Sequence, residues 1–252
     1  MRYALRREEF EIYYQPVVCL QGNQVVGAEA LIRWNHPKEG LILPNSFIPV
    51  AEESGLIYEL SDWIIATVCH QIRDWTKKGM SSPQISINIS PLHFYRHDFL
   101  DNFRQIIKNS GVDPHSLVIE VTEGLAMKHI ETATAKLGTL KEMGVQIALD
   151  DFGIGHSSLN YLKALPVNKI KIDKSFVQNS ITDPIDAAII SAISTLSRSM
   201  GITIVAEGVE TQEQEDFLRK SGFADEIQGF LISQAIPAPA FSRFIQNWEA
   251  RE

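Results

Sequence analysis

The sequence contains little cysteine. Only Cys19 and Cys69 occur in 252 residues, and their separation matches no metal-binding motif. A zinc site built from cysteines is therefore excluded. Two isolated cysteines are typical of small buried side chains in a protein from a reducing compartment.

An excess of positive charge is also lacking. The chain has 31 acidic and 23 basic side chains, which gives a formal net charge of −8. A protein that holds a nucleic-acid backbone without sequence preference needs a basic face, so polymeric nucleic acid is excluded as a partner. A small anionic ligand remains compatible with this charge, because a bound cation can mediate the contact.

Long apolar runs are absent as well. No run reaches the roughly 18 residues of a membrane span, and the opening MRYALRREEF lacks the apolar core of a signal peptide. We expect a cytoplasmic domain that makes no membrane contact itself, although a membrane anchor in a parent protein is compatible with it. The opening residues are typical of the middle of a helix, which favours one domain, 1–252, taken from a longer protein.

Short apolar runs alternate with segments of helical period, such as 190–200 and 211–223. Eight such runs predict an α/β fold, a (β/α)₈ or TIM barrel. Only the residues CLQGNQ separate the first two runs, which is too short for a parallel crossover and predicts an antiparallel first strand. The expected strands are 11–18, 25–33, 84–90, 117–123, 146–151, 168–173, 203–209 and 226–230.

The stretch IALDDFGIG ends an apolar run with two adjacent aspartates, Asp150 and Asp151. Neighbouring carboxylates repel each other and are costly to desolvate together. Active sites of such barrels lie at the carboxyl ends of the strands, and further polar groups are expected there. These residues are Glu29, Asn88, Glu120, Asp150, Asp151, Lys171, Asp173, Glu207 and Gln228.

This set of polar residues points to a metal site. Buried ion pairs that merely neutralise one another explain any single residue, but only Lys171 and Arg33 are obvious cations nearby, and unpaired buried charge is expensive. One or two hard divalent cations with oxygen ligands resolve the imbalance. A glycosidase on the same barrel needs only two carboxylates, so Asn88, Lys171 and the paired aspartates suit a metal site better.

The same blocks resemble the EAL domain, the bacterial phosphodiesterase domain that acts on cyclic di-GMP. The signature EALIR at 29–33 is followed by WNHP, and YYQP surrounds Gln15. The resemblance extends from about Leu5 to about Phe244. The further blocks, in order, are NIS at Asn88, EVTE at 120–123, DDFGIG from Asp150, KID at 171–173, AEGVE at 206–210 and QGF at Gln228.

This resemblance implies metal-dependent hydrolysis of cyclic di-GMP to linear pGpG, with one or two Mg²⁺ or Mn²⁺ ions. Ca²⁺ is expected to occupy the same oxygens and to inhibit. It also implies a homodimer formed through the loop and helix after Asp151. The implied metal ligands are Glu29, Asn88, Glu120, Asp150 and, for a second ion, Asp151.

The resemblance also implies roles for other residues. Lys171 is implied to hold the attacking water, and Glu207 to act as general base or as a further ligand of that water; both join Glu29 and Asp151 as catalytic residues. Glu123 is implied to anchor the loop after DDFG. The implied substrate contacts are Gln15, Leu31, Arg33, Asp173, Glu210 and Gln228.

Three positions depart from the family pattern. Ile154 and His156 stand where the family usually has Thr and often Tyr, and Gln234 stands where Lys is common. None is an implied catalytic position. A receptor that binds cyclic di-GMP without cutting it remains the alternative, although inactive relatives usually lose the Glu of EAL, a paired aspartate or the loop glutamate, all present here.

Overall fold

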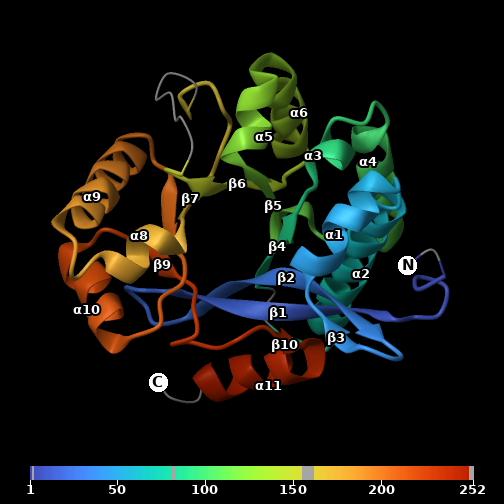
Figure 1. Ribbon diagram of the computed structural model, residues 1–252, viewed down its shortest axis with the longest axis horizontal. Helices are drawn as coiled ribbons and strands as arrows, with labels where there is room; N and C mark the ends of the chain where they lie inside the picture. The colour runs from blue at the N-terminus through green and yellow to red at the C-terminus, as the bar shows by residue number, and fades with distance from the viewer. Residues whose placement is uncertain (2, 81–82, 155–161, 250–252) are drawn as a thin grey trace.

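The first two strands form an antiparallel hairpin, as their short connection predicts. The structure is a computed structural model that describes residues 1, 3–80, 83–154 and 162–249. β1 (Phe10–Cys19) pairs with β2 (Val25–His36), from Phe10 opposite Trp34 to Val18 opposite Val25. This hairpin lies along one side of the barrel (Figure 1).

Parallel strands follow β2 around the barrel and bring the chain back to β1. Each pairs with the next, and β9 closes the ring by pairing antiparallel with β1. The predicted TIM-type barrel with an antiparallel first strand is confirmed. The strands are β4 (Gln84–Asn88), β5 (Leu117–Thr122), β6 (Gln146–Phe152), β7 (Lys169–Ile172), β8 (Thr203–Ala206) and β9 (Glu226–Ile227), while β3 (Gly40–Ile42) and β10 (Ile236–Pro237) extend the sheet at β2 and β1.

Helices surround the barrel (Figure 1). Their ends follow local sequence signals: one helix begins at a capping box formed by Thr211 and Gln214 and ends at Gly222, whose φ is 64°. The helices are α1 (Pro44–Glu53), α2 (Ile57–Lys77), α3 (Pro91–Phe94), α4 (Phe99–Ser110), α5 (Glu123–Lys128), α6 (Ile130–Glu142), α8 (Lys174–Asn179), α9 (Pro184–Ser199), α10 (Gln212–Ser221) and α11 (Ala238–Glu249).

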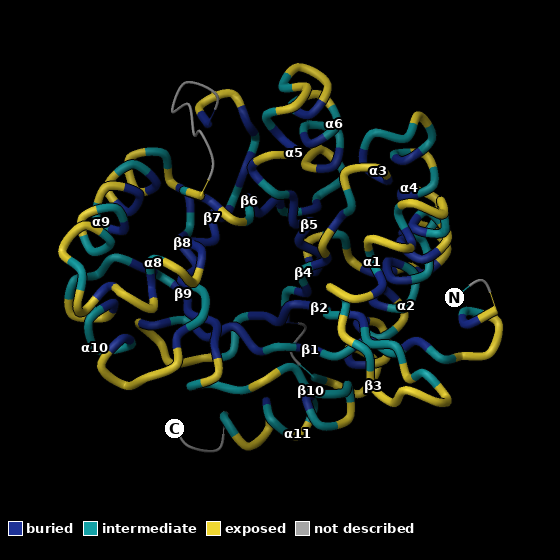
Figure 2. Tube along the Cα trace, viewed as in Figure 1, coloured by how far each residue is buried: buried dark blue, intermediate teal, exposed yellow. Residues whose placement is uncertain are grey.

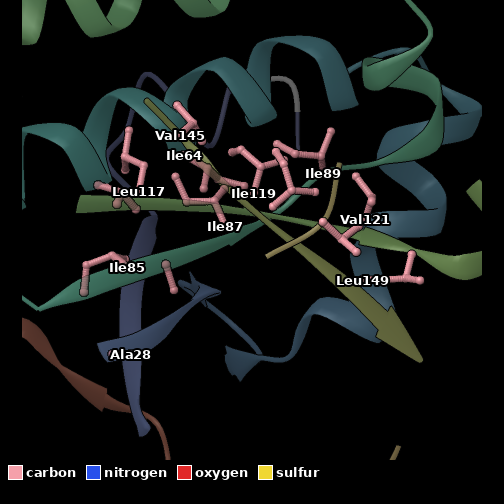
Figure 3. Packing of buried hydrophobic residues seen from close by; sticks show 14 of the residues in the cluster. Ala28, Ile64, Ile85, Ile87, Ile89, Leu117, Ile119, Val121, Val145 and Leu149 are labelled. Atoms are coloured by element: carbon pink, nitrogen blue, oxygen red, sulfur yellow. The ribbon is translucent and has the colours of Figure 1, made fainter. Parts of the chain in front are cut away.

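The main core lies between the outer face of the barrel and these helices. Ile87 of β4 and Ile119 of β5 gather with Ile64 of α2 (Figure 3), and the strands are buried along most of their length (Figure 2). Because successive side chains of a strand face opposite ways, Asn88 and Glu120 are directed away from this core. Burial of the apolar face thus aims the polar residues at the barrel mouth and interior.

One expectation about the N-terminus is wrong. Residues 3–8 form turns instead of a helix. The chain must enter β1 at Phe10, and Glu8 adopts a left-handed φ of 56°, which a helix does not accommodate. Among the helices that the structure describes, none combines the length and the apolar character that crossing a membrane requires.

The two thiols should differ in reactivity. Both cysteines are free; Cys69 is fully buried, whereas Cys19 is partly exposed. Burial raises the pKa of the Cys69 thiol to about 11, so about one thiol in a thousand is ionised at pH 8. We expect a disulfide reagent to modify at most Cys19 in the folded protein and both cysteines in guanidinium. Rapid labelling of Cys69 in the native state would contradict this packing.

Candidate active site

Lys171 lies at the centre of the barrel mouth, surrounded by carboxylates from four strands or strand ends. Its Nζ is 2.7 Å from Glu207 Oε1 and 2.8 Å from Glu120 Oε2. Glu29 Oε2 and Asp150 Oδ1 each lie 3.4 Å away. The structure therefore brings together five residues that are far apart in the sequence, with one ammonium group among four carboxylates.

The excess of negative charge perturbs these groups. Burial raises the pKa of Glu120 to about 8, and repulsion from Glu29 and Asp150 adds to the effect. Burial likewise raises the pKa of Glu207 to about 7. Burial opposes the charged form of Lys171, but the carboxylates together raise the pKa of its ammonium group well above the ordinary value. Lys171 is thus firmly protonated, and it does not neutralise the whole cluster.

Glu29 is held by two side-chain amides as well as by Lys171. Gln228 Nε2 donates to Glu29 Oε2 at 2.7 Å and to Gln15 Oε1 at 3.1 Å, while Asn88 Nδ2 donates to Glu29 Oε1 at 2.6 Å. Burial works to raise the pKa of the Glu29 carboxyl, but Lys171 and these two amides outweigh it, so the pKa lies below the ordinary value. Glu29 is therefore ionised at neutral pH.

A β-bulge explains the paired aspartates. The register between β6 and β7 shifts between Leu149 and Phe152, so β6 carries one extra residue there. Asp151 adopts a left-handed φ of 56°, and its N–H donates to Asp150 Oδ1 at 3.0 Å. On a regular strand, adjacent side chains face opposite ways. The bulge allows Asp150 to contact Lys171 while Asp151 also reaches the mouth.

The mouth is a cavity of about 470 Å³ above this cluster. Asp173, buried at the N-terminus of α8, and Glu210, which accepts from Gln178 Nε2 at 3.2 Å, lie at its wall. Most residues predicted for the site line this cavity: Gln15, Glu29, Leu31, Asp150, Asp151, Lys171, Asp173, Glu207, Glu210 and Gln228.

Four predicted residues lie elsewhere around the mouth. Asn88 and Arg33 line a neighbouring cavity of about 490 Å³ that shares Leu31 with the first. Glu120 faces the barrel interior below the mouth. Glu123 lies at the start of α5, and the Gly153 N–H donates to its Oε2 at 3.4 Å.

The loop after DDFG is described only as far as Ile154, whose side chain is 60% exposed. His156 lies outside the described residues, as does most of the loop assigned to a dimer contact. Gln234 is exposed and lines neither cavity of the mouth.

The structure adds residues that sequence reasoning missed. Phe230 is 64% exposed and lines the mouth, as do Lys174 and Gln178 of α8. Asn45, in the first turn of α1, lines both cavities. Phe230 belongs to the QGF block, so that motif could have predicted it as a site residue. No pattern in the sequence marks Asn45.

The donors at the mouth suit a hard divalent cation by their chemistry. Carboxylates and an amide converge there around the ammonium group of Lys171, and burial and repulsion from Asp150 raise the pKa of Asp151. Within the described ranges, no three His, Cys, Asp or Glu side chains form a preassembled metal cage. Asn88 currently donates its Nδ2 to Glu29, so presenting its oxygen to a cation requires the amide to turn.

Comparison with known proteins agrees with this geometry. The family described as the EAL domain matches residues 1–235. The chain belongs to the EAL domain family. This EAL domain is 42% identical over 94% of its length to the bifunctional diguanylate cyclase/cyclic di-GMP phosphodiesterase MucR of Pseudomonas aeruginosa. It is also 35% identical over 98% of its length to the cyclic di-GMP phosphodiesterase NbdA of Pseudomonas aeruginosa.

The EAL domain also resembles solved structures. A structure of the PaMucR phosphodiesterase in complex with c-di-GMP has a TM-score of 0.91 and 41% sequence identity; the match covers 95% of this chain and 97% of that one. The chain spans about a third of the length of the curated relatives: 35% of MucR and 32% of NbdA. Activities of those whole proteins therefore do not transfer directly to this EAL domain.

Proposed function

We propose that this EAL domain hydrolyses one phosphodiester bond of cyclic di-GMP and releases linear pGpG, with Mg²⁺ or Mn²⁺ as its cofactor. The observation that carries the proposal is the convergence of Glu29, Glu120, Asp150 and Glu207 within 3.4 Å of Lys171 Nζ. An acidic mouth repels an anionic phosphodiester, and a divalent cation reverses that repulsion. The similarity to MucR and NbdA supports the same substrate.

The residues of the mouth divide the chemistry among them. Glu29, Asn88, Glu120 and Asp150 would hold one cation and Asp151 a second, and a bound cation would acidify the attacking water and neutralise phosphate charge. Lys171 positions the water. Glu207 Oε1 lies 2.7 Å from Lys171 Nζ, so a water held by Lys171 would be within its reach. Because the pKa of Glu207 is raised to about 7, this carboxylate is suited to accept the proton of that water. The water oxygen bonds to phosphorus as the bond to the leaving ribose oxygen breaks. That oxygen takes up a proton from solvent, and Glu207 returns its proton to solvent.

The shape of the mouth suits a ligand with two bases. The cavities of about 470 and 490 Å³ lie side by side and share Leu31 and Asn45, and each is within the usual size range of ligand pockets. Arg33, held over the Tyr13 ring at 5.5 Å, lines the second cavity and is suited to a phosphate.

Phe230 is expected to support a guanine base. Stacking of a base on an exposed aromatic ring contributes about 1–3 kcal/mol. We expect Phe230→Ala to raise KM for cyclic di-GMP about five- to hundredfold with little change in kcat. Phe230→Tyr keeps the ring and should stay close to the parent protein. An unchanged KM in Phe230→Ala would show that neither guanine base stacks on Phe230.

Separation of nucleotides over time tests the proposed function. The protein is incubated with cyclic di-GMP and Mg²⁺, Mn²⁺ or Ca²⁺, beside an EDTA control and Glu29→Ala. Formation of pGpG with Mg²⁺ or Mn²⁺, abolished in both controls and weak with Ca²⁺, is the expected result. Saturable binding without product would instead identify a receptor that does not cut its ligand.

We also propose that the domain forms a homodimer through the loop and helix after Asp151. The exposed Ile154 at the start of this segment supports the proposal. Sedimentation of Ile154→Asp beside Leu41→Asp, an exposed apolar residue on β3, tests it. A dimer weakened only by Ile154→Asp is expected, and a monomeric parent protein would refute the interface.

A further inference from the structure

A second buried ion pair lies inside the barrel below the catalytic cluster. Lys169 Nζ donates to both carboxylate oxygens of Glu226 at 2.8 Å, and both residues are more than nine-tenths buried. Lys169 stands two residues before Lys171 on β7, and Glu226 stands two residues before Gln228. Because side chains alternate along a strand, each member of this pair faces the same way as a residue of the mouth.

The stability of the fold does not explain why this buried ion pair is present. Buried ion pairs are often no more stabilising than apolar side chains of the same volume, because both charges lose their hydration. The pair spans β7 and β9 across β8, where Val205 supplies only an apolar side chain. It therefore fixes the two strands that present Lys171 and Gln228.

A small cavity lies between this ion pair and the residues of the mouth, because Lys169 and Glu226 line it together with Lys171 and Gln228. Its volume of about 10 Å³ is close to that needed by a single water molecule. Its wall is mainly apolar but includes the polar side chains of Ser86, Lys169, Glu226 and Gln228. Gln228 Oε1 is buried and has no hydrogen-bond partner among the residues that the structure describes. A water in this cavity would donate to Oε1 and thereby keep Nε2 directed at Glu29, to which it donates at 2.7 Å.

We propose that Lys169, Glu226 and one water in this cavity form a polar floor that positions Gln228 and Lys171 for the reaction. Lys169 and Glu226 are positioning residues, since neither lines the mouth. Their effect passes through Gln228 to Glu29 and along β7 to Lys171. The kinetic part of this inference rests on the proposed hydrolysis of cyclic di-GMP, whereas the water site does not.

Three floor variants test the inference: Glu226→Gln, Lys169→Met and the double variant Lys169→Met/Glu226→Leu. Losing an outer partner of an active-site group typically reduces activity ten- to hundredfold. We expect each variant to lower kcat by that factor with KM for cyclic di-GMP within about twofold.

The single variants should also unfold at lower temperature, and the double variant should recover thermal stability but not kcat. The matched control is Asp98→Asn, which removes an ion pair with Arg96 outside the barrel and should leave kcat unchanged.

A high-resolution crystal structure provides a readout independent of activity. Ordered density for one water within hydrogen-bonding distance of Gln228 Oε1, lost in the double variant, is expected. A dry cavity in the parent protein, or a double variant with parental kcat, would overturn the inference. If the parent protein does not hydrolyse cyclic di-GMP, the proposed function fails. The water density and the orientation of the Gln228 amide then still show whether the polar floor exists.

Discussion

Replacing Lys171 with methionine should lower the free energy of unfolding of the metal-free protein by about 3–5 kcal/mol, because removing one partner leaves buried carboxylates uncompensated. The side chain is 3% exposed, and four carboxylates lie within 3.4 Å of its ammonium group. For a chain of this size, the loss corresponds to a fall in Tm on the order of 10 °C. Hydrolysis should be lost as well, because Lys171 is the residue proposed to position the water.

Added metal should affect the stability and the activity of Lys171→Met differently. A divalent cation that binds only the folded protein stabilises it by mass action, so Mn²⁺ should restore part of the lost stability without restoring hydrolysis. Urea denaturation in EDTA and in Mn²⁺, together with pGpG formation, measures both effects. Lys220→Met is the control, because the surface pair of Lys220 with Asp216 at 3.2 Å contributes at most about 0.5 kcal/mol. Equal stability of Lys171→Met and this control would contradict the described cluster.

Gly229→Ala should be among the most damaging substitutions of an uncharged residue in this chain. A Cβ at Gly229 would overlap the backbone nitrogen, carbonyl carbon and oxygen of Val209. This close approach lets Val209 N–H donate to Gln228 O at 3.1 Å and Leu231 N–H donate to Val209 O at 3.0 Å. Overpacking typically costs about 1–3 kcal/mol and occasionally more. Here the obstacle is backbone, which cannot rotate away.

The effect of Gly229→Ala should reach activity as well as stability. Gly229 lies between Gln228 and Phe230, and Val209 lies between Gly208 and Glu210, so pushing the two segments apart widens the mouth. We expect a lower Tm and a loss of hydrolysis that is larger than the loss of folded protein. Gly138→Ala, in α6 with nothing within 4 Å of the added Cβ, should instead stabilise the domain by about 0.5–1 kcal/mol. A parental Tm for Gly229→Ala would refute the close approach.

Local sequence patterns predict much of the barrel. Each expected strand overlaps one that the structure describes, and the short CLQGNQ connection correctly predicts the hairpin. The inward direction of Lys171 followed from the apolar Ile170 and Ile172 on either side of it. These features are set by neighbours in the sequence, which is why a periodic pattern identifies them.

Other features depend on contacts between distant segments. The bulge at Asp150 and Asp151 is visible only in the register of β6 against β7. Asn45 of α1 lines one cavity with Arg33 of β2 and Asn88 of β4, and no local pattern in the sequence predicts that these segments meet. The turns at 3–8 replace an expected helix because the chain must align with β1. Local propensity is a weak guide wherever tertiary contacts override it.

Closure of the ring between β1 and β9 has a consequence for biosynthesis. Gln15 of β1 is joined to Gln228 and to Ser233 by hydrogen bonds, so the last strands of the barrel to leave the ribosome complete the sheet that its first strands begin. Until they emerge, β1 has an open edge, and such edges favour aggregation. The high contact order of this closure predicts slow final folding. A nascent chain that stops before β9 therefore carries most of the barrel's residues but no assembled mouth.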